Sequence, residues 1–458
     1  MIVCEEIAVS EKFKKIERVI IMTNISTAFM TDKYELTQLQ AMLQSGKAHQ
    51  KATFELFARS LPEGRRYGVV GGVSRAIEAV KNFKLTEEQL EYLSNDPVIK
   101  NQTIEYLREY SFTGKIIGYQ EGELYFPYSP ILTVEGTFGD SVLLETVLLS
   151  ILNHDSAVMS AASRMVLAAD EKPLIEMGSR RTHEESAVSA ARAAYIAGFN
   201  ATSNLEAGLR YGIPTTGTSA HAFTLAFENE IDAFKAQVEA LGKNTTLLVD
   251  TYNIEQGIRN AVQVAGSDLG GIRIDSGDLR EETINARKLL DELGAMNTKI
   301  VLSSDIDEFT IAELLDNGTP VDVIGAGTRV VTGSGHPTAK MVFKLVERED
   351  ENGQMVPVSK KASGKKSIGG FKKAYRTFTE GKISGEYFVN RNDVFISKEE
   401  TVPMQKVFAD NGEFFIPSVE QSRRLHQQVL KQLPDEARLI SAGNAALQAE
   451  EGDRNEEH

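Results

Sequence analysis

The sequence has one cysteine, Cys4, among its 458 residues. A single cysteine excludes an intramolecular disulfide and a thiolate-rich zinc site, and it fits a reducing compartment. The sequence also lacks a run of about 20 apolar residues, the length that crosses a bilayer. Its N-terminal stretch lacks the apolar region of a signal peptide. We therefore expect a cytoplasmic protein without a membrane partner, and we treat residues 1–30 as an N-terminal extension.

Positive charge is scarce, because 50 Lys and Arg face 65 Asp and Glu and give a net charge of −15. Extended electrostatic binding of nucleic acid is therefore disfavoured, and any phosphate group must be bound by a few residues at a local site. The content of hydrophobic residues, 41%, is ordinary for a globular protein. The length suggests two or three cooperating lobes.

The hydrophobic pattern and composition of the chain change at three positions after residue 31. Mixed helical and strand patterns over residues 31–138 predict an N-terminal α/β lobe. Over residues 139–345, a long helix is followed by short apolar runs that alternate with helical spacing, which predicts a parallel sheet closed into a barrel or doubly wound. Residues 346–444 are expected to pack on the N-terminal lobe as short strands and loops. Residues 445–458 are polar and acidic, which predicts a disordered tail.

The informative residues follow the apolar runs of the middle region, because barrel enzymes place their catalytic groups at the carboxyl ends of strands. These ends carry arginines, carboxylates and a glycine-rich turn, but no Walker motif and no dinucleotide fingerprint. A phosphorylated sugar with Mg²⁺ therefore fits better than a dinucleotide. The clusters are EMGSRR (176–181), ATSN (201–204), GTSAH (217–221), DTYN (250–253), RIDSGD (273–278), SSD (303–305) and GAGT (325–328).

Each cluster also has a purely structural interpretation. The arginines at 180–181 can pair with the glutamates at 184–185 on a solvated helix, and His221 can be a packed core histidine. Residues 275–278 can form a turn that caps the next helix. The glycines at 325 and 327 can serve close packing alone. Only the coincidence of all clusters with strand ends favours a functional site.

The sequence resembles the nicotinate phosphoribosyltransferases, which belong to the type II phosphoribosyltransferases, from about Thr31 to Val346 and more weakly through Tyr375. The resemblance implies an irregular (β/α) barrel with a flanking α/β sandwich lobe built from N- and C-terminal segments. It also implies the joining of nicotinate to 5-phosphoribosyl 1-pyrophosphate, which gives nicotinate mononucleotide and pyrophosphate in NAD salvage, coupled to ATP hydrolysis. The segments that carry it are TDKYEL (31–36), FELF (54–57), GSRR (178–181), GTSAH (217–221), LVDTY (248–252), RIDSGDL (273–279) and IGAGT (324–328).

The same resemblance implies roles for single residues. His221 matches a histidine that ATP phosphorylates, and it is the expected catalytic residue together with Asp250 and Asp275. Asp250 would orient the ribose or Mg²⁺, while Arg273 and Asp275 would position the ring and the ribose. ATP is then a co-substrate and Mg²⁺ a cofactor, without a dedicated metal site in the protein.

Tyr34 matches a tyrosine that stacks on the pyridine ring from the neighbouring subunit, although an exposed helix aromatic is the structural alternative. This match implies a homodimer with shared active sites. Arg180 or Arg181, with Thr218, would meet nicotinate or phosphate. The full set of substrate-binding positions that the resemblance implies, besides Tyr34 and Arg273, is Arg180, Arg181, Asn204, Thr218, Ser303, Asp305, Gly325, Gly327 and Thr328.

Asn204 bears on the choice between acid and amide substrates. In the similar nicotinamide phosphoribosyltransferases this position is an aspartate, which accepts from an amide and would repel a carboxylate. The neutral Asn204 favours nicotinate, with a nicotinamide enzyme or a non-catalytic pyridine nucleotide or phosphosugar-binding barrel as alternatives. Two positions depart from the family pattern: Met177 replaces a base-stacking aromatic residue, and Asn253 replaces an aspartate.

Overall fold

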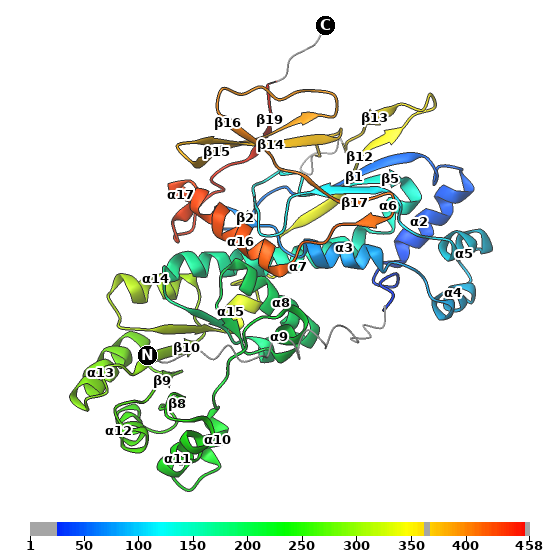
Figure 1. Ribbon diagram of the computed structural model, residues 1–458. Helices are drawn as coiled ribbons and strands as arrows, with labels where there is room; N and C mark the ends of the chain where they lie inside the picture. Colours follow the sequence, from blue (N-terminus) through cyan, green and yellow to red (C-terminus); the bar gives the residue numbers. More distant parts are fainter. Residues whose placement is uncertain (1–24, 361–366, 454–458) are drawn as a thin grey trace, which may run out of the picture.

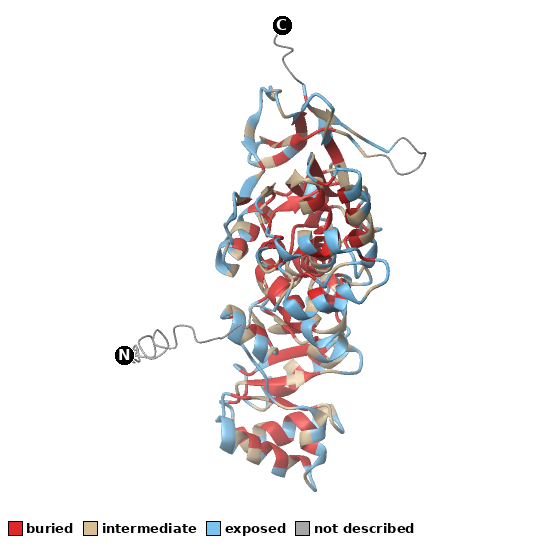
Figure 2. Cartoon of the chain, turned by 90° about the vertical axis from the view of Figure 1, so that its right-hand side faces the viewer, coloured by how far each residue is buried: buried red, intermediate tan, exposed pale blue. Residues whose placement is uncertain are grey.

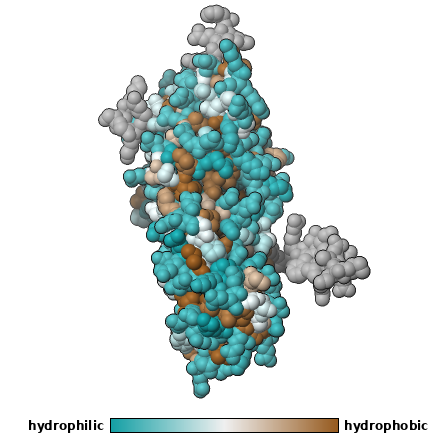
Figure 3. All heavy atoms as spheres, turned by 90° about the vertical axis from the view of Figure 1, so that its left-hand side faces the viewer, coloured by the Kyte–Doolittle hydropathy of each residue, from teal (hydrophilic) through white to brown (hydrophobic). Residues whose placement is uncertain are grey.

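A computed structural model describes residues 25–360 and 367–453, which form an elongated molecule of two stacked lobes (Figure 1). The upper lobe in Figure 1 combines segments from both ends of the chain, and the lower lobe holds its middle. Buried residues run through the interior of both lobes (Figure 2). The face in Figure 3 is largely hydrophilic, with apolar patches over both lobes.

The upper lobe is built on a seven-stranded antiparallel sheet that N- and C-terminal segments share. In β1, every residue after Lys51 is buried, because both faces of this strand are covered. Phe54 of β1 stacks on Phe343 of the neighbouring strand with ring centroids 5.0 Å apart. The strands in spatial order are β13 (Met355–Pro357), β12 (Met341–Glu349), β1 (Lys51–Ala58), β5 (Leu132–Thr137), β3 (Lys115–Gly118), β17 (Lys406–Asp410) and β18 (Glu413–Phe414).

Short helices and a two-stranded ribbon complete the N-terminal part of this lobe. Residues 25–30 were expected to belong to a dispensable extension, but Thr27 Oγ1 donates to the Ala79 carbonyl at 2.6 Å and Ala28 is buried. An extension can therefore comprise at most residues 1–24, which lie outside the described residues. The elements are α2 (Lys33–Gln44), β2 (Gly68–Val69), α3 (Val73–Lys81), α4 (Glu87–Ser94), α5 (Asn101–Arg108), β4 (Leu124–Tyr125) and α6 (Phe138–Val142).

The C-terminal segment adds a four-stranded sheet and two helices. Its strands in spatial order are β16 (Glu400–Pro403), β14 (Lys372–Thr379), β15 (Lys382–Asn390) and β19 (Ala449–Glu451), and its helices are α16 (Val419–Val429), η2 (Leu430–Gln432) and α17 (Asp435–Arg438). The expectation of a disordered tail from residue 445 is wrong as far as residue 453. Strand β19 pairs in parallel with the open edge of β15, which composition alone does not reveal. Residues 454–458 lie outside the described residues.

The lower lobe contains a six-stranded sheet in which all neighbours are parallel. Its spatial order is β7 (Ala201–Thr202), β6 (Leu174–Glu176), β11 (Val323–Ala326), β10 (Lys299–Ser304), β9 (Gly271–Ile274) and β8 (Thr246–Leu248). This is the cyclic order of a singly wound barrel opened between β7 and β8, with one bridge from Thr202 to Thr215 at the opening. The predicted α/β fold with a parallel sheet is confirmed, but closure into a barrel is not, since no ladder among the described residues joins β7 to β8.

Helices connect these parallel strands, as the alternating pattern predicted. They are η1 (Ser179–Arg181), α8 (Glu184–Ala197), α9 (Leu205–Tyr211), α10 (His221–Leu225), α11 (Glu230–Leu241), α12 (Ile254–Ala265), α13 (Leu279–Glu292), α14 (Glu308–Asp316) and α15 (Thr328–Val331). Most begin at a polar residue that caps the first turn, for example Asn253 before α12 and Asp307 before α14. These caps fix where each loop ends and thereby how much chain lies at the carboxyl edge of the sheet.

The helix expected over residues 141–169 is divided, because α6 ends at Val142 and α7 (Glu145–Ala169) begins after it. Leu148 and Leu152 of α7 belong to the upper core, while Met159 and Met165 belong to the lower core. Residues 138–169 are long and apolar enough to cross a membrane by composition, yet 61% of the most apolar window is buried. The apolar character of this helix is therefore explained by its place in two cores.

The expected domain boundaries shift in two places. Residue 345 falls inside β12, because this strand already pairs with β1 of the upper sheet. The C-terminal segment was expected to pack on the N-terminal lobe, but α16 also packs on the lower lobe. Arg423 donates to the Phe199 carbonyl at 2.7 Å, and Val429 is part of the lower core. The amphipathic face of α16 thus joins the two lobes.

Candidate active site

His221 lies in the chain that crosses the opening between β7 and β8, at the first position of α10. Its Nε2 is 3.0 Å from Oδ1 of Asp250, which follows β8. The His221 side chain is 39% exposed, whereas that of Asp250 is 1% exposed. The alternative of a packed core histidine is therefore wrong: a buried carboxylate holds the imidazole, which remains accessible to a ligand.

Asp250 joins the ends of three neighbouring strands. Its Oδ2 accepts from the Asp275 backbone N–H at 2.9 Å and from the Ser276 hydroxyl at 2.7 Å. Oδ1 of Asp275 accepts in turn from the Ser303 hydroxyl at 2.6 Å, at the end of β10. The structure thus brings His221, Asp250, Asp275 and Ser303 together in one chain of contacts.

Arg273 in β9 has neither a hydrogen bond nor an ion pair with any residue that the structure describes, and its Nε is buried without a partner. Burial lowers the pKa of its guanidinium, the carboxylates of Asp275 and Asp250 raise it, and Arg180 lowers it. A partly buried cation without a direct partner is unfavourable unless an anionic group binds to it. Arg273 is therefore the best candidate for contact with an anionic ligand.

The ends of β6 and β7 bring Asn204 beside Ser179. Oδ1 of Asn204 accepts from the Ala207 N–H at 2.8 Å and caps α9, while Nδ2 donates to the Ser179 hydroxyl at 3.0 Å. Because only the oxygen can accept from a backbone N–H, the cap fixes the orientation of the amide. The fully buried Glu176 lies next to this pair and accepts from the Thr202 hydroxyl at 2.5 Å.

The arginines at 180–181 are exposed in η1. Their expected structural partners, the glutamates at 184–185, form their ion pairs with His183 and Arg210 instead, so that alternative is wrong for the part of the chain that the structure describes. Thr218 and Asp305 are also exposed, in the loops before α10 and after β10. All four side chains are accessible at the carboxyl edge of the sheet.

The glycines at the end of β11 differ in their packing. A Cβ atom on Gly325 would lie 2.9 Å from Sδ of Met177 and 3.3 Å from Cβ of Ser303, so close packing alone accounts for this glycine. A Cβ on Gly327 would approach nothing closer than 3.4 Å. Packing therefore does not require Gly327, whose position directly before Thr328 and α15 leaves the phosphate interpretation open.

Two expected polar groups are helix caps. Oδ1 of Asp278 accepts from the N–H groups of the first turn of α13, so the turn-and-cap alternative holds for Asp278 but not for Asp275. Asn253, which departs from the family pattern, caps α12 by accepting from the Gln256 N–H at 2.9 Å. An asparagine serves this purpose as well as an aspartate does.

Tyr34 does not join this cluster. It is 47% exposed at the start of α2 in the upper lobe, whereas α10 lies at the far end of the lower lobe (Figure 1). Desolvation raises the pKa of Tyr34 to about 12, and the nearby Glu145 and Glu35 contribute in the same direction. A role for Tyr34 beside His221 requires a second copy of the chain.

Sequence reasoning missed the buried acid behind the site. Glu230 begins α11 and accepts from the Asn260 amide at 3.0 Å, while its Oε1 is buried without a partner among the described residues. Burial raises the pKa of Glu230, and the charge of Asp250 raises it further. In the sequence Glu230 looks like any acid in the first turn of a helix, so no signal pointed to it.

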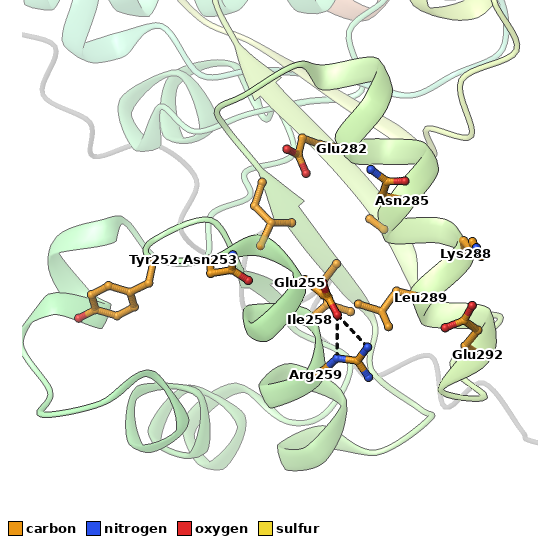
Figure 4. Close-up of a pocket in the computed structure, with 12 residues that line it drawn as sticks. Tyr252, Asn253, Glu255, Ile258, Arg259, Glu282, Asn285, Lys288, Leu289 and Glu292 are labelled. Atoms are coloured by element: carbon orange, nitrogen blue, oxygen red, sulfur yellow. Dashed lines mark hydrogen bonds and ion pairs between the residues drawn. The ribbon is translucent and has the colours of Figure 1, made fainter.

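A groove of about 520 Å³ runs between α12 and α13, with Ile258 and Leu289 among its lining residues (Figure 4). Tyr252 and Asn253 stand at one end of it, and Arg259 pairs with Glu255 within it. None of the expected catalytic or substrate-binding residues lines this groove. The candidate site is instead the cluster at the carboxyl edge of the sheet.

Comparisons with known proteins agree with the sequence resemblance. The model of the nicotinate phosphoribosyltransferase N-terminal domain matches residues 29–153. The nicotinate phosphoribosyltransferase pncB1 of Mycobacterium tuberculosis is 51% identical over 431 residues, which cover 91% of this chain and 94% of the relative. The Bacillus subtilis enzyme is 40% identical over 79% of this chain and 75% of its own length.

A solved structure shows the same architecture. The crystal structure of human nicotinic acid phosphoribosyltransferase aligns with a TM-score of 0.78 and 25% identity, over 92% of this chain and 97% of the human chain. Identity of 51% over nearly the whole length leaves no doubt about the relationship. The chain therefore belongs to the nicotinate phosphoribosyltransferase family.

Proposed function

We propose that this protein joins nicotinate to 5-phosphoribosyl 1-pyrophosphate to give nicotinate mononucleotide and pyrophosphate, coupled to ATP hydrolysis through a phosphorylated His221. The observation that carries the proposal is the accessible His221, held by the buried Asp250 next to an Arg273 that has no direct partner in the described part of the chain. A non-catalytic sugar-binding barrel has no need of an oriented, exposed imidazole. The family of the chain points to the same reaction.

The geometry around His221 suits phosphoryl transfer. If Asp250 accepts the proton of Nε2, the lone pair of His221 lies on Nδ1. Nδ1 then attacks the terminal phosphorus of ATP, a nitrogen–phosphorus bond forms, and ADP leaves with the electrons of the broken oxygen–phosphorus bond. The buried carboxylate stabilises the positive imidazole that results, as the third group of a catalytic triad does. Water later cleaves the phosphohistidine.

Glycosyl transfer would use the other side of the cluster. The pyridine nitrogen of nicotinate attacks the anomeric carbon of the ribose, and pyrophosphate leaves with the electrons of the broken bond. Positive charge develops on the sugar, and the carboxylate of Asp275, fixed by the Ser303 hydroxyl, favours that charge. Arg273 is placed to bind an anionic group of either substrate.

Mg²⁺ fits this donor set only as an ion that the substrate phosphates hold. The described residues contain no group of three or more His, Cys, Asp or Glu side chains that could hold a metal. Both carboxylate oxygens of Asp250 are already in hydrogen bonds, which leaves Asp275 and the exposed Asp305 as oxygen donors. Mg²⁺ commonly binds one or two carboxylates plus phosphates, and it would neutralise the leaving pyrophosphate.

A homodimer with shared sites is part of the proposal. Tyr34 and His221 lie in different lobes of one chain (Figure 1), so a second copy must supply the tyrosine if both act in one site. Large apolar side chains are exposed in both lobes: Met30 is 57% exposed in the upper lobe, and Leu205 and Leu209 of α9, in the lower lobe, are 78% and 70% exposed. Burial of such side chains against a second copy would stabilise a dimer.

The preference for the acid over the amide is assigned to Asn204. Its oxygen is occupied by the helix cap, and its Nδ2 has one hydrogen left after the bond to Ser179. A donor at this position suits the carboxylate of nicotinate better than the amide of nicotinamide. A cytoplasmic location accords with the single cysteine.

The test is product formation from 5-phosphoribosyl 1-pyrophosphate with nicotinate, nicotinamide or quinolinate, each with and without ATP, for the wild type and His221→Ala. We expect turnover with nicotinate alone, raised by ATP in the wild type but not in the variant. Radiolabel from the terminal phosphate of ATP should appear as acid-labile phosphohistidine in the wild type only. Turnover of nicotinamide would contradict the assignment of Asn204, and no turnover with any base would favour the binding barrel.

A further inference from the structure

Glu176 is a fully buried carboxylate without a cationic partner among the residues that the structure describes. It ends β6, and its neighbours in the chain are Met177 and Gly178. Burial raises the pKa of Glu176, and two hydrogen bonds oppose that shift. A buried acid that no Lys or Arg neutralises is costly, so its retention here calls for a local reason.

The two oxygens of Glu176 start a closed ring of hydrogen bonds. Oε1 accepts from the Gly178 N–H, and Oε2 accepts from the Thr202 hydroxyl at 2.5 Å. Oγ1 of Thr202 accepts from the Asn204 N–H at 3.0 Å, and Nδ2 of Asn204 donates to the hydroxyl of Ser179, the neighbour of Gly178. The ring is tied further by the backbone bond from Ser203 N–H to the Glu176 carbonyl at 2.9 Å.

We propose that Glu176 is a positioning residue that fixes the distance and orientation between the Asn204 amide and the Ser179–Arg181 turn, and thereby sets the preference for an acid over an amide base. The proposal rests on the proposed function, and it goes further because it assigns base specificity to a residue that does not itself touch the base. The turn follows β6 and the amide follows β7, so the two come from different strand ends and are held together by hydrogen bonds.

Only a carboxylate satisfies this ring completely. The Gly178 N–H and the Thr202 hydroxyl both donate to the side chain of residue 176, and a carboxylate can accept from both. A glutamine would present its NH₂ group to one of these two donors, so one contact must break or reverse. A reversed Thr202 would accept from both the new NH₂ group and the Asn204 N–H, so its own buried hydroxyl proton would lose its acceptor and the loop that carries Asn204 would be disturbed.

The experiment compares Glu176→Gln and Thr202→Val with two matched controls. Both variants break the link between residues 176 and 202, and Thr202→Val also removes the acceptor of the Asn204 N–H. Thr202→Ser keeps the hydroxyl and should restore the wild-type behaviour. Thr283→Val removes a buried hydroxyl that bonds only within α13, away from the site. For each variant we measure KM for nicotinate, KM for 5-phosphoribosyl 1-pyrophosphate, the ratio of kcat/KM for nicotinate over nicotinamide, and Tm.

We expect Glu176→Gln and Thr202→Val each to raise KM for nicotinate about tenfold and to lower the nicotinate-to-nicotinamide ratio by a similar factor, the usual consequence of one lost contact to a charged group. KM for the sugar phosphate should change less than about twofold. The double variant should be no worse than Thr202→Val alone, because that variant already breaks the link to residue 176.

Equal losses with both bases, together with a lower Tm, would mean that Glu176 only stabilises the fold and would overturn the inference. An unchanged nicotinate-to-nicotinamide ratio in both Glu176→Gln and Thr202→Val, with normal nicotinate turnover in the wild type, would also overturn the inference. A wild type that does not turn over nicotinate would instead refute the proposed function and this inference with it. The two failures are therefore distinguishable.

Discussion

Asp250→Asn changes one atom in the candidate site and leaves its shape unchanged. The Asp275 N–H and the Ser276 hydroxyl both donate to Oδ2 of Asp250, at 2.9 and 2.7 Å, so these donors would hold the oxygen of the new amide. The NH₂ group of the amide then faces Nε2 of His221, which is 3.0 Å away. Nε2 must accept from it, which moves the ring proton to Nδ1 and blocks attack by that atom.

The expected magnitude follows from the contact that is lost. A hydrogen bond to a charged group contributes about 1.5–3 kcal/mol, which corresponds to roughly 10- to 150-fold in the rate of phosphoryl transfer. Solvent cannot replace the carboxylate, because the side chain of Asp250 is 1% exposed. Stability should change little, because the two donors to Oδ2 keep their acceptor.

The assay measures the yield of phosphohistidine and the stimulation of nicotinate turnover by ATP. Asp250→Asn should lose most of the stimulation and keep a larger share of the turnover without ATP. Ser276→Ala removes one donor to the same carboxylate and serves as the matched control, with a loss of only a few-fold. Wild-type stimulation and phosphohistidine yield in Asp250→Asn would refute the proposed role of the pair.

Three further outcomes are expected. Asn204→Asp keeps the cap of α9, so Tm should hold while the nicotinate-to-nicotinamide ratio falls about tenfold through charge repulsion. Mixing Tyr34→Ala with His221→Ala chains should restore about a quarter of wild-type turnover if sites are shared, and none if they are not. Burial lowers the pKa of His426 to about 4 and raises that of Glu35 to about 7. The unfolded chain therefore takes up the histidine proton as pH falls from about 6.5 to 4, so that group makes stability fall with falling pH, whereas Glu35 makes stability fall as pH rises from about 4.5 to 7. Urea unfolding of Glu35→Gln should show the free energy of unfolding rising by about 2 kcal/mol from about pH 5 to 6.5, because only the His426 contribution remains. In His426→Gln it should fall by about 2 kcal/mol over the same range. The same dependence of stability on pH in both variants would contradict both assignments.

The sequence predicted that several of these residues would lie together because they follow apolar runs that form parallel strands. Asp250, Asp275 and Ser303 each stand within two residues of a buried strand segment, and such ends meet at one edge of a parallel sheet. His221 was among the polar clusters that the sequence singled out, but its catalytic role came only from the resemblance, since the chain around it forms a five-residue helix without a strand of its own. Local patterns predict that the carboxyl edge of the parallel sheet carries the polar groups. They do not predict which loop brings His221 to that edge.

Other features depend on contacts that no local pattern encodes. The tail pairs with β15 because that strand has an open edge, and the boundary at residue 345 fails because β12 continues the sheet of β1. The ring that Glu176 begins exists only because β6 and β7 are neighbours in space. Composition predicted a disordered tail and no role for Glu176. Both predictions missed contacts with strands that are adjacent in space but distant in the chain.

The opening between β7 and β8 connects the architecture with the proposed chemistry. The chain before α10 makes one isolated bridge to the sheet among the described residues, and the imidazole of His221 is 39% exposed while the side chain of Asp250, just after β8, is 1% exposed. A histidine that must meet a nucleotide and then a sugar phosphate needs both conditions, a fixed orientation and an open face.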